Sequence, residues 1–151
     1  MDRKYQYRES GLDNVILVGL PECVDDDGDD CITIPHINDL HKQIVRTIIT
    51  RDAGMSGGEL KFIRTELGLT QAELAKIVSR ERLAVGRWES NEIEIDSNAE
   101  TIIRLVAAER LGIALGVPVE DVSGWCVQSA DVKPIVIDAS DPNHYRPLRA
   151  A

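Results

Sequence analysis

The chain has 151 residues, of which 43% are hydrophobic and only 4% aromatic, and its formal net charge at pH 7 is -9. This length suits one ordinary domain or two very small ones, and a core filled by Leu, Ile and Val favours helices and short strands. Apolar runs such as VILVGL and PIVI are too short to span a bilayer, which excludes a membrane-spanning protein. The first ten residues lack the apolar stretch of a secretion signal, so the sequence predicts a cytoplasmic protein.

The N-terminal segment has the pattern of a β-hairpin. Two short extended runs, residues 15–20 and 31–34, flank an aspartate-rich loop around Gly28. A helix is predicted after Pro35, with Asn38 as its N-cap. Its apolar side chains fall on one face: Leu40, Ile44, Val45, Ile48 and Ile49.

A glycine-rich break over residues 51–59 precedes four further predicted helices. Ser56 caps the first, which ends at Gly68, and Thr70 caps the second in a capping box with Glu73. The third opens near Glu81, and Asp96 or Ser97 caps the fourth. Their predicted core residues are Leu60, Ile63, Leu67, Leu74, Ala75, Val78, Val85, Trp88, Ile102, Leu105 and Val106.

The pattern weakens beyond Gly116. The stretch KPIVIDAS predicts a strand, GVPVEDVSGW predicts a loop and DPNHYRPLRAA predicts a frayed tail. The apolar residues Pro134 to Ile137 are a candidate dimer interface.

The junction Ser79-Arg80-Glu81 joins two short predicted helices, and the second exposes basic residues at its start. Two short helices at such a tight junction can place the second helix in the major groove of DNA. If Val85 and Trp88 face the core, the exposed side chains of this second helix are those of Arg82, Leu83, Ala84, Gly86 and Arg87.

The stretch LTQAELAKIVSRERLAVGRWESN, residues 69–91, resembles without gaps the helix-turn-helix core of the phage-repressor family (Cro, lambda repressor and XRE proteins). With flanking helices the resemblance extends over about residues 55–112. It implies a mainly α, lambda-repressor-like bundle of four to five helices, beside the small N-terminal hairpin and helix and the short C-terminal strand.

The resemblance also assigns roles to individual residues. It implies a phosphate contact for Gln71, base contacts for Arg82, Leu83 and Arg87, and a buried ion pair between Arg64 and Glu89. An arginine could pair with guanine, while Leu83 or Ala84 could pack on a thymine methyl group. Ser79 and Arg80 depart from the family, which usually has Gly and an apolar residue there; Arg80 could reach phosphate or the turn could differ slightly. The simpler alternative is that these arginines form only the solvated face of a bundle.

The charge is unevenly distributed along the chain. Residues 1–50 contain ten acidic and five basic residues, residues 51–92 seven of each, and residues 93–151 nine and five. A net charge of -9 argues against general affinity for DNA, but it allows a localised basic face. A homodimer could turn two such faces towards double-stranded DNA and keep its acidic parts away.

The stretches YQYRESGLDNVILVGL, IPHINDLHKQI and GGELKFIRTELGLTQAELA resemble the MqsA-like (YgiT-type) antitoxins, in which a small zinc module precedes the helix-turn-helix. The C-x-x-C pattern of that module is lost here, since Asp27 and Gly28 stand where its second cysteine and glycine would lie. The resemblance implies an autoregulating antitoxin with a cognate toxin. The aspartate tract could attract a basic toxin, or it could simply keep the hairpin soluble.

No cofactor or metal is predicted. Three irregularly spaced cysteines do not form a disulfide framework, and we expect buried thiols. A zinc site at Cys23, Cys31, His36 and His41 is a weak candidate because its spacing is unusual. The tract DDDGDD lacks the ligand pattern of a calcium loop.

Three segments are therefore predicted: residues 1–53 as a degenerate zinc-ribbon-like module, 54–115 as the DNA-binding domain and 116–151 as an extension. The predicted function is a sequence-specific, dimeric DNA-binding repressor that is also an antitoxin. The alternative is a module that captures a partner protein without specific DNA binding. No catalytic motif is present, so an enzyme is not expected.

Overall fold

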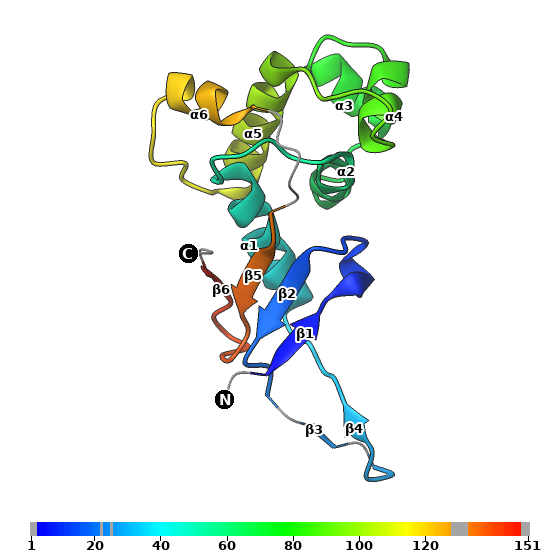
Figure 1. Cartoon of the computed structure of the whole chain (residues 1–151), viewed down its shortest axis with the longest axis vertical. Coiled ribbons are helices and arrows are strands. Elements are labelled where there is room, and N and C mark those ends of the chain that lie inside the picture. Colours follow the sequence, from blue (N-terminus) through cyan, green and yellow to red (C-terminus); the bar gives the residue numbers. More distant parts are fainter. Residues whose placement is uncertain (1–2, 22, 25, 128–132, 149–151) are drawn as a thin grey trace. The chain divides into compact units, whose positions relative to one another are not determined.

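The computed structural model describes residues 3–21, 23–24, 26–127 and 133–148, which form two compact units (Figure 1). One unit comprises residues 1–44 and 134–151, and the other comprises residues 45–133. This division differs from the three consecutive segments predicted, because both ends of the chain contribute to the first unit. The described residues contain six α-helices, a four-stranded sheet and a two-stranded sheet, so the fold is mixed α and β.

The first unit is built on a four-stranded sheet in the order β1-β2-β5-β6. Its strands are β1 (Lys4–Gln6), β2 (Val15–Val18), β5 (Ile135–Asp138) and β6 (Arg146–Leu148). The central pair, β2 and β5, is parallel, while each edge strand is antiparallel to its neighbour. Val15 pairs with Ile135 and Leu17 with Ile137, and all four side chains are fully buried. This alternation gives the sheet one apolar face.

Three predictions about the sheet differ from the structure. The run beginning at Val15 is a strand, but it pairs with β1 and β5 rather than with residues 31–34. The candidate dimer strand at Pro134 to Ile137 is central, because β5 has hydrogen-bonded neighbours on both sides. Residues 146–148, predicted as frayed tail, form β6. Pairing between the two ends of a chain leaves no local signal in the sequence.

A second, two-stranded sheet surrounds Gly28. Strands β3 (Cys23–Val24) and β4 (Asp30–Cys31) are antiparallel, with Cys23 opposite Cys31 in the register. Cys31 is disulfide-bonded, so the prediction that all three cysteines are thiols is wrong. The irregular spacing of the cysteines did not indicate a disulfide, since antiparallel strands bring together residues that are separated in the sequence. Disulfides are rare in a reducing cytosol, so this bond does not support the predicted cytoplasmic location, which stays a prediction.

Helix α1 (Ile37–Ile49) begins two residues earlier than a helix capped by Asn38 would, so Asn38 lies in its first turn and is not the N-cap. Its predicted face is confirmed, because the five apolar side chains from Leu40 to Ile49 are fully buried. In the first unit, the Tyr7 hydroxyl lies 2.9 Å from His41 Nε2 and joins the end of β1 to α1. No helix among the described residues is long and apolar enough to cross a membrane.

The second unit is helical (Figure 1). It contains the end of α1 followed by α2 (Gly57–Glu66), α3 (Gln71–Ile77), α4 (Arg82–Glu89), α5 (Ser97–Leu111) and α6 (Val119–Trp125). Helix α4 packs against α2 and α3, and α5 packs against α6. The segment predicted as loop contains α6, whose short length and late glycine weaken its helical pattern.

The buried face of α5 differs from the predicted one. Ile102 is 37% exposed, and Leu105 and Val106 are only half-buried. Glu100 and Arg104 are completely buried instead, with Arg104 Nη2 lying 2.8 Å from Glu100 Oε2. A prediction from hydrophobic periodicity assumes that charged residues are exposed. It therefore assigns the wrong buried face to a helix whose ion pair lies in the core.

Candidate nucleic-acid interface

Capping boxes fix the beginnings of α2 and α3. The Thr70 hydroxyl accepts a hydrogen bond from the Glu73 backbone N–H, and the Thr70 N–H donates to Glu73 Oε1 at 3.0 Å. The hydrogen bond that the Thr70 backbone N–H donates to the Glu73 carboxylate is the main reason that the pKa of Glu73 lies below its usual value. Ser56 and Glu59 form the same arrangement on α2. Each box satisfies backbone donors that a helix start leaves unpaired. The sequence predicts the box of Thr70 and Glu73, and it predicts Ser56 as a cap.

The turn between α3 and α4 depends on Ser79. Its φ of 55° is in the left-handed region, which glycine occupies more readily than serine. The Arg80 backbone N–H donates to the Ala75 carbonyl at 2.9 Å and closes the end of α3. The turn is therefore tight even though its residues depart from the phage-repressor pattern.

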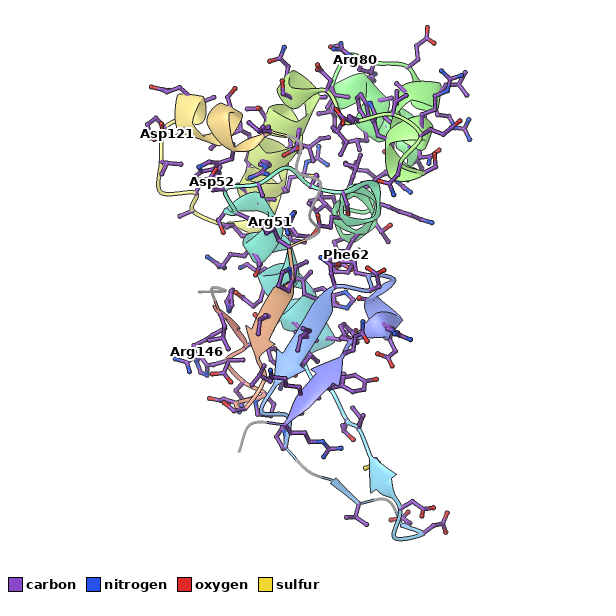
Figure 2. The ribbon with its side chains drawn as sticks, in the orientation of Figure 1. Arg51, Asp52, Phe62, Arg80, Asp121 and Arg146 are labelled. Carbon is purple, nitrogen blue, oxygen red and sulfur yellow. The ribbon has the colours of Figure 1, made fainter. Side chains whose placement is uncertain are left out.

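The side chain of Arg80, labelled in Figure 2, forms an ion pair and does not extend freely from this turn. Its Nη2 atom lies 3.0 Å from Asp96 Oδ2, and both side chains are exposed to solvent. Asp96 Oδ2 also accepts the Ala99 N–H and caps α5. Arg80 thus links the turn to the start of α5, a contact that the sequence pattern did not indicate.

Helix α4 has one buried and one exposed face. Val85 and Trp88 are buried, as predicted, whereas the side chains of Arg82, Leu83 and Arg87 are exposed. Ala84 and Gly86 are half-buried. Within the described part of the chain, neither Arg82 nor Arg87 forms an ion pair. The exposed face therefore presents two guanidinium groups with open donors.

An ion pair joins α4 to α2. Arg64 Nε lies 2.6 Å from Glu89 Oε2, and Arg64 Nη2 donates to Glu89 Oε1 at 3.1 Å, as the resemblance implies. Arg64 Nη1 also donates to the Leu69 carbonyl, and Gln71 Nε2 donates to Glu89 Oε1 at 3.0 Å. The Glu89 carboxylate thereby connects α2, α3 and α4. It accepts a hydrogen bond from the Gln71 amide nitrogen, which the resemblance had implied would contact a DNA phosphate.

The start of α2 packs closely on the end of α4. The Gly57 N–H donates to Asn91 Oδ1 at 2.9 Å, and Asn91 has a φ of 61°. A Cβ atom at Gly57 would lie 2.2 Å from the Trp88 carbonyl oxygen. Close backbone approach, rather than a left-handed φ, therefore requires glycine at position 57. The sequence does not indicate this requirement, because Gly57 lies in a glycine-rich stretch that has the composition of a linker.

The predicted site residues are thus only partly brought together. Arg82, Leu83 and Arg87 share the exposed face of α4, while Arg80 and Gln71 are held by carboxylates of their own unit. Comparisons with protein-family models, curated proteins and solved structures found no match to this chain. The function of this surface therefore has to be argued from its own geometry.

No group of three or more His, Cys, Asp or Glu side chains among the described residues is placed to hold a metal ion. Of the four candidate zinc donors, Cys31 is disulfide-bonded and His41 contacts the Tyr7 hydroxyl. His36 has a φ of 54° directly before α1, and the side chain of Cys23 lies outside the described part of the chain.

Proposed function

We propose that this protein is a sequence-specific regulator that binds double-stranded DNA with α4 in the major groove. The observation that carries the proposal is the pair Arg82 and Arg87, which are exposed and outside any ion pair among the described residues. They lie on α4 away from its buried residues Val85 and Trp88. Arginine donates two parallel hydrogen bonds to guanine O6 and N7, the commonest base-specific contact in this groove.

The contacts of α4 support this role because they hold the helix in one orientation. The Glu89 carboxylate accepts hydrogen bonds from Arg64 and Gln71, so α2 and α3 both hold the end of α4. Side chains on a rigid helix meet base edges with less loss of conformational entropy than side chains on a mobile loop.

The charge distribution fits a local rather than a general attraction to DNA. The chain carries a net charge of -9, yet residues 51–92 contain equal numbers of acidic and basic residues. Phosphate attraction supplies most non-specific affinity, so this protein should discriminate strongly between sequences and bind random DNA weakly. We propose a homodimer, because two helices spaced by one turn of DNA double the number of bases read.

The narrower assignment as an antitoxin has only the sequence resemblance behind it. The N-terminal segment is not an independent module, because β2 pairs with β5 from the other end of the chain. We therefore propose DNA binding as the function and leave the partner protein to experiment. Co-expression with the product of an adjacent gene, followed by co-purification, would test for a toxin.

The proposed function is tested by selecting binding sites from a random library of DNA duplexes. Binding of a selected duplex is then measured by fluorescence anisotropy over a range of salt concentrations. Arg82→Ala and Arg87→Ala should each weaken binding of the selected duplex at least about fivefold, since a bidentate base contact contributes about 1–3 kcal/mol.

The matched control is Lys4→Ala, which removes one positive charge from β1 in the other compact unit. It should leave the affinity within about twofold of the parent, because a lysine outside the reading helix makes no base-specific contact. Failure to enrich any sequence, or normal binding by both arginine variants, would reject the proposal. Circular dichroism would confirm that each variant remains folded.

A further inference from the structure

Two residues on α4 have no structural role that explains them. Leu83 is 62% exposed between Arg82 and Arg87, in a position where an apolar side chain gains nothing from the core. Gly86 lies one turn further along the same helix. Residues three apart are neighbours on a helix surface, so Leu83 and Gly86 form one strip between the two arginines.

Glycine at position 86 is not required by the fold. Its φ is not in the left-handed region, and a Cβ atom there would meet only the Gln71 amide, at 3.8 and 3.9 Å. These are ordinary van der Waals distances, so alanine would fit. Glycine inside a helix is nevertheless less stable than alanine, which means that Gly86 weakens α4 without relieving any contact in the described residues.

Both observations are explained if the ligand, rather than the protein, needs this shape. A bare backbone at Gly86 lets a surface approach the helix axis more closely, and an exposed leucine offers that surface an apolar contact. The flanking guanidinium groups favour a polyanion over an apolar protein partner. In the major groove, the apolar group of a base is the 5-methyl of thymine.

We propose that Leu83 and Gly86 form a methyl-reading strip, in which Leu83 packs on a thymine 5-methyl group and Gly86 permits the close approach. This inference rests on the proposed DNA binding and names the base that the same site recognises. Cytosine and uracil lack the methyl group, so the strip selects thymine at one position in each half-site.

The first test replaces each thymine of the selected duplex, one at a time, with deoxyuridine, which removes only the methyl group. At one position per half-site the parent protein should lose roughly three- to fivefold in affinity, the effect of exposing one buried methyl group. Leu83→Ala should bind the thymine and deoxyuridine duplexes equally well.

The second test separates stability from binding with Gly86→Ala. This variant should raise Tm by about 2–4 °C, because alanine favours the helix, while the affinity for the selected duplex falls about tenfold. The matched control is Gly124→Ala in α6, where an added Cβ meets open space. The Gly124→Ala control should raise Tm as well and leave DNA binding unchanged.

The outcomes distinguish this strip from the proposed function. If no duplex is enriched, DNA binding itself is rejected. If a duplex is enriched but deoxyuridine is tolerated at every position, or Gly86→Ala binds as tightly as the parent, the strip is rejected and the proposed function stands. Leu83→Ala could instead lose affinity equally for the thymine and the deoxyuridine duplex and sediment as a monomer. That result would assign the strip to a protein contact and would also overturn the inference.

Discussion

Arg64 and Glu89 form an ion pair in which Arg64 Nε lies 2.6 Å from Glu89 Oε2, with the two side chains only 15% and 5% exposed. The pair connects α2 to α4 across 25 residues of sequence. An ion pair this far from water stabilises a fold less than its short distance suggests, because both charges lose hydration. Its main consequence is the fixed orientation of α4.

Removing one member of this pair should be more damaging than removing both. Arg64→Met leaves the Glu89 carboxylate nearly buried without its cation, and we expect it to lower the free energy of unfolding by about 3 kcal/mol. The double variant Arg64→Met, Glu89→Met should regain most of this stability. Urea denaturation of the two variants measures the difference, and equal loss in both would show that hydration of Glu89 is not the cause.

A methyl group at position 57 should be poorly tolerated. The new Cβ of Gly57→Ala would lie 2.2 Å from the Trp88 carbonyl oxygen and 2.8 Å from the Glu89 carbonyl oxygen, and both are backbone atoms. Moving the start of α2 away from α4 should cost about 3 kcal/mol. Thermal unfolding followed by circular dichroism is the measurement, and an unchanged Tm would contradict the close approach.

The buried pair of α5 should be essential for the second unit. Arg104 is 0% exposed, donates to Glu100 at 2.8 Å and to the Arg51 carbonyl at 2.7 Å, and also donates to the Ala53 carbonyl. Arg104→Met should therefore cost about 3–5 kcal/mol, since it leaves a buried carboxylate and unpaired carbonyls. The control is Arg110→Met on the exposed part of the same helix, which should change stability by less than about 0.5 kcal/mol. Similar losses in both variants, measured in urea, would argue against this network.

The first unit should show an acid-dependent contribution from Asp138. Ser140 donates from its hydroxyl and its backbone N–H to Asp138 Oδ1, and Arg146, labelled in Figure 2, donates to Asp138 Oδ2. Together these contacts lower the pKa of Asp138 from 3.8 to about 2. Because the folded pKa is the lower one, the stabilisation is full above the unfolded value and is lost as the pH falls from 3.8 towards 2.

Ser140→Ala removes the largest cause of this shift. It should destabilise the protein by about 1 kcal/mol at pH 7, and this difference from the parent should shrink as the pH approaches the folded pKa. Urea titrations at a series of pH values give both quantities. Ser123→Ala on the exposed side of α6 serves as the control and should show no such convergence.

Cys126 should be unreactive in the native protein. It is 5% exposed, and burial raises its thiol pKa from 9.0 to about 11 despite a hydrogen bond from Thr101. At pH 8 only roughly one molecule in a thousand would carry the reactive thiolate, even if reagent could enter. Mass spectrometry should show iodoacetamide on Cys126 only after denaturation. Rapid labelling under native conditions would indicate that α6 opens readily.

Local signals in the sequence determined most of the second unit. Ser56 as a cap and Thr70 with Glu73 as a capping box predicted the starts of α2 and α3, and both helices begin there. Periodic apolar residues correctly placed Val85 and Trp88 inside and so left Arg82 and Arg87 outside. These signals are reliable because a helix satisfies its hydrogen bonds within one short segment.

Tertiary structure alone decided the pairing of β2 with β5, the inward turn of Glu100 and Arg104, and the need for glycine at position 57. Each depends on groups that meet across a long stretch of chain, so no local pattern records it. Strand order follows from which apolar faces can bury each other, and a charged residue can enter a core only where its partner and backbone acceptors are already assembled.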